Sequence, residues 1–316
     1  MTDRLKKILL NRQNILLYFI IIIFLILSLT SKSFLNFISL EGMLFYVFLY
    51  SLMVIGMTIL FISGGFDLGV GSVYGFTCVL TAVLIKSFNL PSALVVLIVI
   101  VTGIAIGAIV GFCIAKLNVN PFITTLASMF IFGSLRIIVA KQKNITGLPE
   151  RFTKFGNITF LNLSILIWIG IAATAIAIVL LRKNKFLRLN YLVGINEKAA
   201  MLMGIKVHKI KIINYAIVSV LASVTALLNT SKYGTAVFTT GEYTALIVIA
   251  AVIIGGCSLS GGRGTIYGSI LGLILITLLN HSISSLGYSE FWNKFALGVV
   301  MLAAIIIDSL REKRSL

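Results

Sequence analysis

Asp67 is the residue of this sequence that most clearly could do chemistry, because it is an acid enclosed between apolar segments. It is the one acidic residue close to membrane depth in the first half of the chain. An ionisable residue at that depth is a functional candidate by default, so Asp67 could line a transport path or couple proton movement to transport. Proton coupling would need a relay of acids or histidines, and none is visible. Alternatively, Asp67 caps the helix that follows it by accepting a backbone N–H bond.

Hydroxyl and amide side chains form a second group of candidates. Asn120, Thr124 and Ser128 recur every four residues and so share one face of a helix, and Thr125 and Arg136 share another. A similar polar face near the C-terminus holds Thr277, Asn280, His281 and Ser284. Such groups suit a neutral, hydroxylated substrate in a transport path, but they suit hydrogen bonds between helices equally well. Arg136 lies one turn from the end of its span, where its side chain could snorkel to the interface.

Two glycine-rich stretches share the form GGxxLxxG, and the second begins 191 residues after the first. The glycines that could serve gating or close packing are Gly64, Gly65, Gly71, Gly255, Gly256, Gly261 and Gly262. Discontinuous helices at matching places in two halves of a chain point to a transport path. The alternative is a pair of tight cytoplasmic turns, with glycines where backbones pack closely.

Catalysis and cofactor binding are not indicated. Cys78, Cys113 and Cys257 are odd in number and show no disulfide or metal-ligand spacing, and His208 and His281 are far apart. There is no nucleophile motif and no phosphate-cradling G-x-x-x-x-G-K-[ST] loop. We therefore expect a chain without catalytic residues, metal or cofactor. If ATP drives its function, a separate ATPase chain would bind the ATP and Mg²⁺.

The elements that position these residues are apolar helices. Of the 316 residues 59% are hydrophobic and 11% charged, whereas a soluble domain carries about a quarter charged residues. This predicts an all-α polytopic membrane protein built as a single transmembrane domain over 1–316. Ten spans of about 20 residues are expected, at 14–30, 43–63, 68–86, 93–115, 122–140, 164–181, 211–230, 243–256, 265–283 and 294–309. Eight spans with re-entrant segments is the competing count.

Charge placement predicts the orientation and argues against nucleic-acid binding, despite the net charge of +17. The charges sit at the ends of apolar runs, as membrane topology requires. With ten spans and a cytoplasmic N-terminus, 17 lysines and arginines lie inside and eight lie outside. Both termini are therefore expected in the cytoplasm. The external loop 141–163 is a candidate docking surface for a partner outside the membrane.

The stretch 182–211 is the one long break in apolar sequence, and it carries eight basic residues against a single acid. It contains a short helix signal, which consists of Asn196, Glu197, Ala199, Ala200, Leu202, Met203 and Gly204. Asn196 can cap the N-terminus, and Gly204 can end the helix. A two-turn helix is not stable alone in water, so its small apolar face needs either the rest of the chain or another protein.

Five stretches resemble the permease subunits of ribose-type bacterial ABC importers for simple sugars. They are SGGFDLGVGS (63–72), NPFITTLASMFIFGSLR (120–136), ITGLPERF (145–152), NEKAAMLMGI (196–205) and IIGGCSLSGGRGTIYGSILG (253–272). The resemblance runs from about residue 43 to Asp308 and marks 196–205 as the cytoplasmic coupling segment. It implies a second permease subunit, an ATPase with two cassettes and an external solute-binding protein, all at the bacterial cytoplasmic membrane.

The sequence departs from this family in one stretch. Where such permeases often read GYELDAIAAVVIGG, this chain reads GEYTALIVIAAVIIGG, so Ala245 and Ile247 stand where acids are common. Glu242 could compensate in part, and the difference would also suit one half of a heterodimer. The expected function is import of a monosaccharide or a similar small solute, with a nucleoside or a sugar-like signal as other possible cargo. The alternative is a stand-alone secondary transporter that uses Asp67 for ion coupling.

Overall fold

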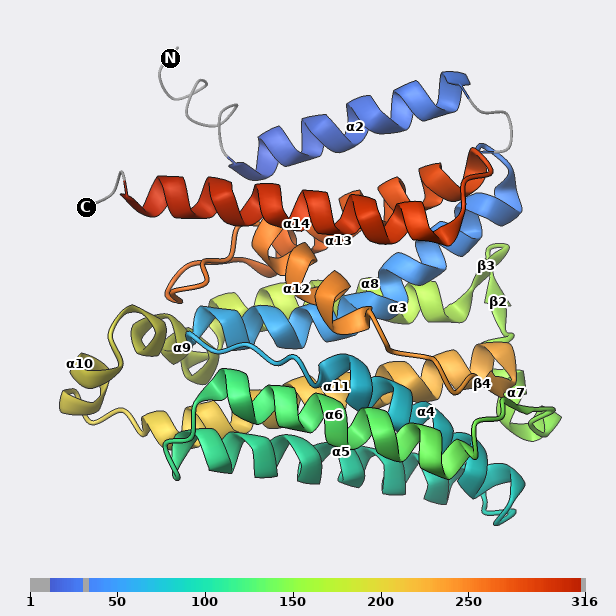
Figure 1. Ribbon diagram of the computed structural model, residues 1–316, viewed down its shortest axis with the longest axis horizontal. Coiled ribbons are helices and arrows are strands. Elements are labelled where there is room, and N and C mark those ends of the chain that lie inside the picture. Colours follow the sequence, from blue (N-terminus) through green and yellow to red (C-terminus); the bar gives the residue numbers. More distant parts are fainter. Residues whose placement is uncertain (1–11, 31–33, 314–316) are drawn as a thin grey trace.

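The computed structural model describes residues 12–30 and 34–313, and it is almost entirely helical (Figure 1). The helices are α2 (Arg12–Thr30), α3 (Phe37–Ile62), α4 (Val70–Lys86), α5 (Ser92–Ala115), α6 (Pro121–Ala140), α7 (Glu150–Gly156), α8 (Ile165–Lys183), α9 (Lys185–Ile195), α10 (Glu197–Leu202), α11 (Val207–Tyr233), α12 (Thr244–Ile254), α13 (Ile266–Ser285) and α14 (Glu290–Lys313). Four two-residue strands complete the fold: β1 (Ile145–Thr146), β2 (Thr159–Phe160), β3 (Leu163–Ser164) and β4 (Thr235–Ala236).

Each apolar segment of the sequence coincides with a helix, but the helices differ in length. Within the described residues, six are long and apolar enough to cross a membrane, namely α3, α5, α6, α8, α11 and α13. Helices α2, α4, α12 and α14 contain shorter apolar segments, at Gln13–Leu29, Val70–Lys86, Thr244–Ile254 and Phe291–Ala303. The chain is an all-α polytopic membrane protein, and the count of ten crossings stays a prediction.

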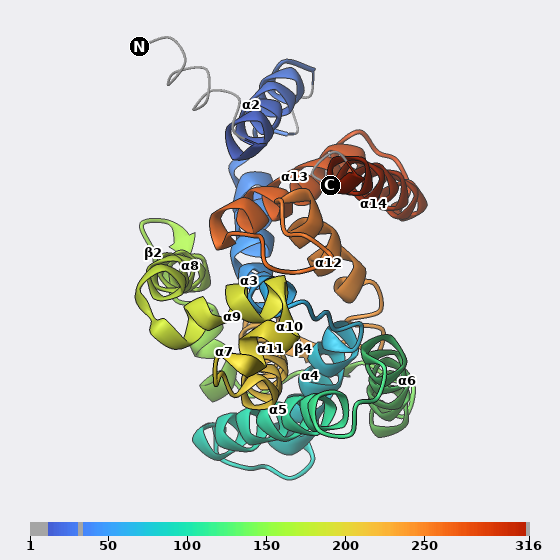
Figure 2. The same cartoon turned by 90° about the vertical axis from the view of Figure 1, so that its left-hand side faces the viewer.

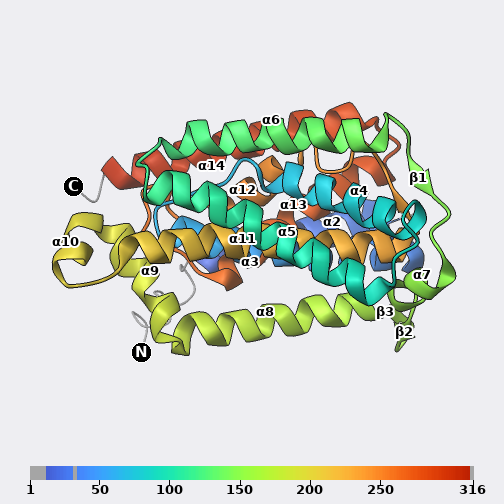
Figure 3. The ribbon, with the colours of Figure 1, turned by 90° about the horizontal axis from the view of Figure 1, so that it is seen from below.

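Helix α11 lies at the centre of the bundle, between α3, α4 and α5 (Figure 3). Its contact with α5 is close because Gly103, Gly107 and Gly111 follow one another every four residues along α5. A Cβ at Gly107 would overlap the Tyr215 carbonyl, and one at Gly111 would come 2.8 Å from the Ile212 Cα. Small residues at this spacing let membrane helices approach closely. This stripe was not among the glycines selected from the sequence.

The connection 63–69 begins with a tight turn at the end of α3, in which the Gly64 N–H donates to the Phe61 carbonyl at 2.9 Å and the Gly65 N–H to the Leu60 carbonyl at 3.0 Å. It runs from the end of α3 back into the body of the bundle, so α4 begins between other helices (Figure 1). The Tyr215 hydroxyl holds it by donating to the Phe66 carbonyl at 3.1 Å. The residues 237–243 behave in the same way, because they lead from β4 back into the bundle before α12 begins (Figure 1). The chain therefore has two connections that run back into the bundle, each followed by a short helix. These two segments, 63–69 and 237–243, are called the re-entrant connections.

The two ends of the bundle are built differently. One end carries α7 and the strands, where β1 pairs with β4 and β2 pairs with β3, both antiparallel. The other end carries α9 and α10, and Figure 2 views the molecule from that side. Helix α11 joins the two ends and has 27 residues, a length of about 40 Å. The basic loop and the loop 141–163 thus lie at opposite ends, as expected from their charges.

Chemical labelling can test which end faces the cytoplasm. The basic residues Arg4, Lys6, Lys7 and Arg314 lie outside the described residues, so the orientation of the termini stays a prediction. Single cysteines at the exposed positions Lys154 and Lys209, in a background without the three native cysteines, should react with an impermeant maleimide from opposite sides. In intact cells only the Lys154→Cys variant should be labelled. Labelling of Lys209→Cys alone would show that the orientation is the opposite one. Labelling of both variants would contradict the placement of α7 and α11's first turn at opposite ends of the bundle.

Candidate transport path and coupling surface

The two re-entrant connections meet inside the bundle through glycines. A Cβ at Gly71 would come 2.6 Å from the Gly241 carbonyl oxygen and 2.8 Å from the Ala245 nitrogen, and a Cβ at Gly75 would overlap the Thr240 carbonyl. Gly241 has a φ of +94°, which L side chains rarely adopt. Gly71 was predicted as a packing or gating residue, and the structure places it in direct backbone contact with the connection before α12. The sequence paired 64–71 with 255–262 and missed this contact with 237–243.

Asp67 lies beside this junction and is only 2% exposed. Its Oδ1 accepts a hydrogen bond from the Gly69 backbone N–H at 2.7 Å, just before α4 begins at Val70. Ser128 of α6 packs on the same turn, because a Cβ at Gly69 would come 2.6 Å from the Ser128 Oγ. The carboxylate thus stabilises the turn that starts α4, and the N-cap position itself belongs to Gly69. Its role in a transport path stays a prediction.

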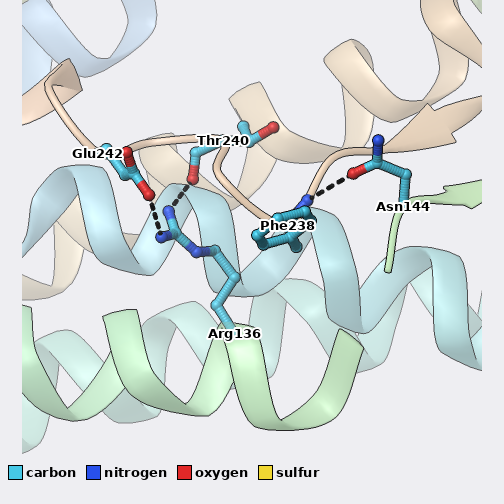
Figure 4. A network of polar contacts seen from close by, with 5 residues as sticks. All are labelled: Arg136, Asn144, Phe238, Thr240 and Glu242. Atoms are coloured by element: carbon cyan, nitrogen blue, oxygen red, sulfur yellow. Dashed lines mark hydrogen bonds and ion pairs between the residues drawn. The ribbon is translucent and has the colours of Figure 1, made fainter. Parts of the chain in front are cut away.

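Arg136 fixes the connection 237–243 against α6 (Figure 4). Its guanidinium donates to the Thr240 carbonyl through Nη1 and to the Glu242 carboxylate at 3.3 Å through Nη2. The Arg136 side chain is 4% exposed and that of Glu242 is 42% exposed. Arg136 therefore points inward to a partner, and the interpretation that it snorkels to the interface was wrong. At the start of the same connection, the Phe238 N–H donates to the Asn144 Oδ1 at 3.2 Å.

Removing one partner of this ion pair should destabilise the protein more than removing both partners. In Glu242→Ala the Arg136 charge stays buried and keeps only the Thr240 carbonyl, and a buried charge without its partner is strongly destabilising. The double variant Arg136→Met/Glu242→Ala removes the charge as well. We expect Glu242→Ala to lower the thermal unfolding temperature in detergent and the double variant to recover part of that loss. The single variant Arg136→Met completes the comparison. If the double variant lost as much unfolding temperature as the two single variants together, or more, the two residues would not act as a pair.

The polar stripe of α6 is used largely within its own helix. Asn120 is the N-cap and accepts from the Phe122 N–H at 2.9 Å. Thr124 donates to the Asn120 carbonyl and Thr125 to the Pro121 carbonyl, both at 2.9 Å. Thr125 is buried, and Asn120 is exposed. These bonds satisfy the hydroxyl protons, so the structure adds no observation that places this stripe on a path.

A cavity of about 350 Å³ lies between α3 and α13 and includes two of the predicted path residues, Thr277 and Asn280. His281 also lines it, and its Nε2 is 2.9 Å from the Ser39 Oγ. Thr277 is 4% exposed and its Oγ1 has no hydrogen-bond partner among the described residues. His281 is a hydrogen-bonded histidine, as the sequence suggested, and Thr277 offers a free hydroxyl beside it.

Three chain segments cross at the end that carries α9 and α10. The Gly262 N–H donates to the Ile62 carbonyl at 2.9 Å, and a Cβ at Gly261 would come 2.8 Å from the Gly64 Cα and 3.0 Å from the Gly194 Cα. The two GGxxLxxG stretches therefore touch each other, and Gly194 of α9 joins them. The remaining glycines serve nearby packing: Gly255 lies against Gly268, Gly256 takes a φ of +101°, and Gly65 packs on Leu60. Gly194 was missed because the motif next to it, 196–205, predicts only a short helix and no contact with the glycine-rich stretches.

Helix α10 forms as its local signals predict. The Asn196 Oδ1 accepts from the Ala199 N–H at 3.0 Å, and Gly204 has a φ of +78° just beyond the helix end. Glu197 pairs with Lys211 at 2.5 Å. Ala200 is fully buried against Val193, Val207 and Ile210, so it faces the chain itself. Leu202 and Met203 are 90% and 62% exposed, so this apolar face at the end of α10 has no partner among the residues that the structure describes.

Comparison with known proteins identifies the family of this chain. The sequence profile of a family described as "Branched-chain amino acid transport system / permease component" matches residues 39–305. The chain belongs to this permease family. No solved structure matches the fold. No group of three or more metal-ligating side chains occurs among the residues that the structure describes.

Curated relatives cover nearly the whole chain. The chain is 36% identical to the ribose import permease protein of Bacillus subtilis (strain 168), over 91% of this chain and 89% of that protein. It is 29% identical to the galactose/methyl galactoside import permease protein of Escherichia coli (strain K12), over 96% and 98%. It is also 33% identical to a probable ABC transporter permease protein of Sinorhizobium fredii, over 83% and 79%.

Proposed function

We propose that this chain is the membrane-spanning permease subunit of an ATP-driven importer for a monosaccharide or a similar small solute. One combined observation carries the proposal. Two re-entrant connections meet inside a membrane bundle, and α10 presents an exposed apolar face at the end that holds the basic stretch 182–211, called here the basic end. Permeases for ribose and for galactose resemble the chain over nearly its full length. A stand-alone ion-coupled transporter is not favoured, since Asp67 already accepts a bond from the Gly69 N–H and no relay of acids or histidines surrounds it within the described part of the chain.

The re-entrant connections would form part of the transport path. Discontinuous helices in transporters leave backbone groups near the membrane midplane, where they can contact a passing solute. In this chain the connections before α4 and α12 are joined through Gly71 and Gly241, and Arg136 ties the second of them to α6. A change in their relative position would open or close the path. The chain would perform no chemistry of its own.

The partners follow from the two ends of the bundle. At the basic end, the exposed face of α10 would dock into an ATPase with two cassettes, which binds the ATP and Mg²⁺. At the other end, α7 and the paired strands would receive an extracytoplasmic solute-binding protein. A second permease subunit would complete the path. We place the assembly in the bacterial cytoplasmic membrane with both termini of this chain in the cytoplasm.

Uptake by the reconstituted complex tests the proposal. The chain, its permease partner and the ATPase would be placed in proteoliposomes, and ATP-dependent uptake of labelled ribose, galactose and a nucleoside would be measured with the binding protein outside. We expect uptake of at least one sugar that needs internal ATP and persists when a protonophore removes the proton gradient. Uptake that collapses with the proton gradient while ATP is maintained would contradict an ATP-driven importer.

A further inference from the structure

A large cavity lies outside the features discussed so far. It has a volume of about 860 Å³ and lies where the end of α8, the helix α9 and the first turn of α13 come together. Figure 2 looks at the end of the molecule on which it sits. Its size matches that of a ligand site. The two re-entrant connections and Arg136 do not border it, because 63–69, 237–243 and α6 contribute no lining residue.

The polar wall of this cavity is cationic. Arg182 lies in the last turn of α8, and Lys185 and Arg188 follow on α9; all three are exposed and line the cavity. No acidic residue is among its lining residues, and the described residues show no ion pair for these three cations. Three uncompensated positive charges around one cavity repel cations and do not select neutral solutes. They suit an anion with several acceptor oxygens, such as a phosphate, because arginine binds phosphate through paired N–H groups.

The remaining wall is apolar and places the cavity at the membrane surface. Ile178, Leu181 and Ile266 line it beside the cations. Helix α8 spans 19 residues from Ile165 to Lys183, which is about 28 Å and close to the thickness of the hydrocarbon layer. The cations at its end therefore lie at headgroup level, and Ile178, one turn deeper, lies at acyl-chain level. A soluble phosphate would leave this apolar wall in water, whereas a phospholipid would cover both walls.

We propose that this cavity binds an anionic phospholipid of the leaflet on the α9 side. The phosphate would contact Arg182, Lys185 and Arg188, and an acyl chain would lie against Ile178 and Leu181. Basic pockets at the cytoplasmic surface are where anionic lipids are held. The site also touches the coupling end of the chain, because Tyr191 lines the cavity and donates to the Gly264 carbonyl at 2.9 Å. The inference does not depend on which solute is transported.

Native mass spectrometry of the purified full-length chain tests this proposal. The protein would be titrated in detergent with phosphatidylglycerol and with phosphatidylethanolamine of the same acyl composition, and the retained lipid adducts counted. We expect the wild type to retain phosphatidylglycerol preferentially. With about 1 kcal/mol for each basic residue at the surface, Arg182→Gln/Arg188→Gln should bind it about thirtyfold more weakly. The single variant Lys185→Gln should lose about fivefold and serves if the double variant does not fold.

The control removes the same charge from the same end of the molecule. Lys206 and Lys209 are exposed and line no part of the cavity, so Lys206→Gln/Lys209→Gln should leave the affinity within about twofold of wild type. An equal loss in the control would mean that only general surface charge attracts the lipid, and the proposal would fail. It would also fail if phosphatidylethanolamine bound equally well. Displacement of phosphatidylglycerol by millimolar inorganic phosphate would assign the site to a soluble phosphate instead.

Discussion

Replacing Leu202 with aspartate should abolish uptake while the permease still folds and inserts. The Leu202 side chain is 90% exposed at the end of α10, so the chain itself gains nothing from its burial. If this face docks into the ATPase, burial of the leucine there contributes roughly 1.5–3 kcal/mol. The aspartate would lose that contribution and place an unpaired charge in a partly dry contact, at a further cost of several kcal/mol. We expect the ATPase to be lost on purification and uptake to fall to background.

Two controls isolate the docking contact. Lys198→Ala changes a different face of α10 and should have a mild effect. Leu161→Asp makes the same chemical change at a residue that is 70% exposed, but at the opposite end of the bundle, and should keep the ATPase bound. Co-purification of the ATPase and uptake would be measured at matched expression. Normal retention and uptake in Leu202→Asp would show that α10 is not the coupling element.

The second large effect is expected for Gly241→Ala, although it adds only one methyl group. Gly241 has a φ of +94°, and its new Cβ would overlap the Gly71 carbonyl oxygen. A left-handed backbone costs a residue with a Cβ about 1–2 kcal/mol, and overpacking costs about 1–3 kcal/mol more. The connection before α12 would have to move away from α4. We expect the unfolding temperature in detergent to fall by roughly 10 °C and uptake to fall below about a tenth of wild type.

The matched control for this variant is Gly298→Ala. A Cβ at Gly298 meets nothing within 4 Å, and alanine is a better helix former than glycine. It should therefore leave both the unfolding temperature and uptake at or slightly above wild type. Fluorescence-monitored unfolding and uptake in the same membranes would compare the two. Unchanged values for Gly241→Ala would mean that the contact with Gly71 is not needed for the fold or for transport.

The features that the sequence determined by itself are local or depend on composition. Asn196 caps α10 as predicted, because a cap joins a side chain to backbone N–H groups two or three residues away. Gly204 takes the left-handed conformation that its place after a short apolar face required. The apolar segments form helices because a segment inside the membrane has no water to bind, and a helix satisfies its backbone hydrogen bonds within itself. The motifs within them were enough to recognise the permease family.

Only the tertiary structure decided how these segments meet. Arg136 and Glu242 are 106 residues apart, and no local pattern in either segment predicts their pairing. The same holds for Gly194, which belongs to the basic stretch 182–211 and yet packs against the two GGxxLxxG stretches. The glycines near Asp67 predict the tight turn that ends α3, but they do not determine whether the chain then returns into the bundle. The choice depended on Gly71, Gly75 and Gly241 leaving room for two backbones inside the bundle, and close packing between distant segments is not encoded in any one of them.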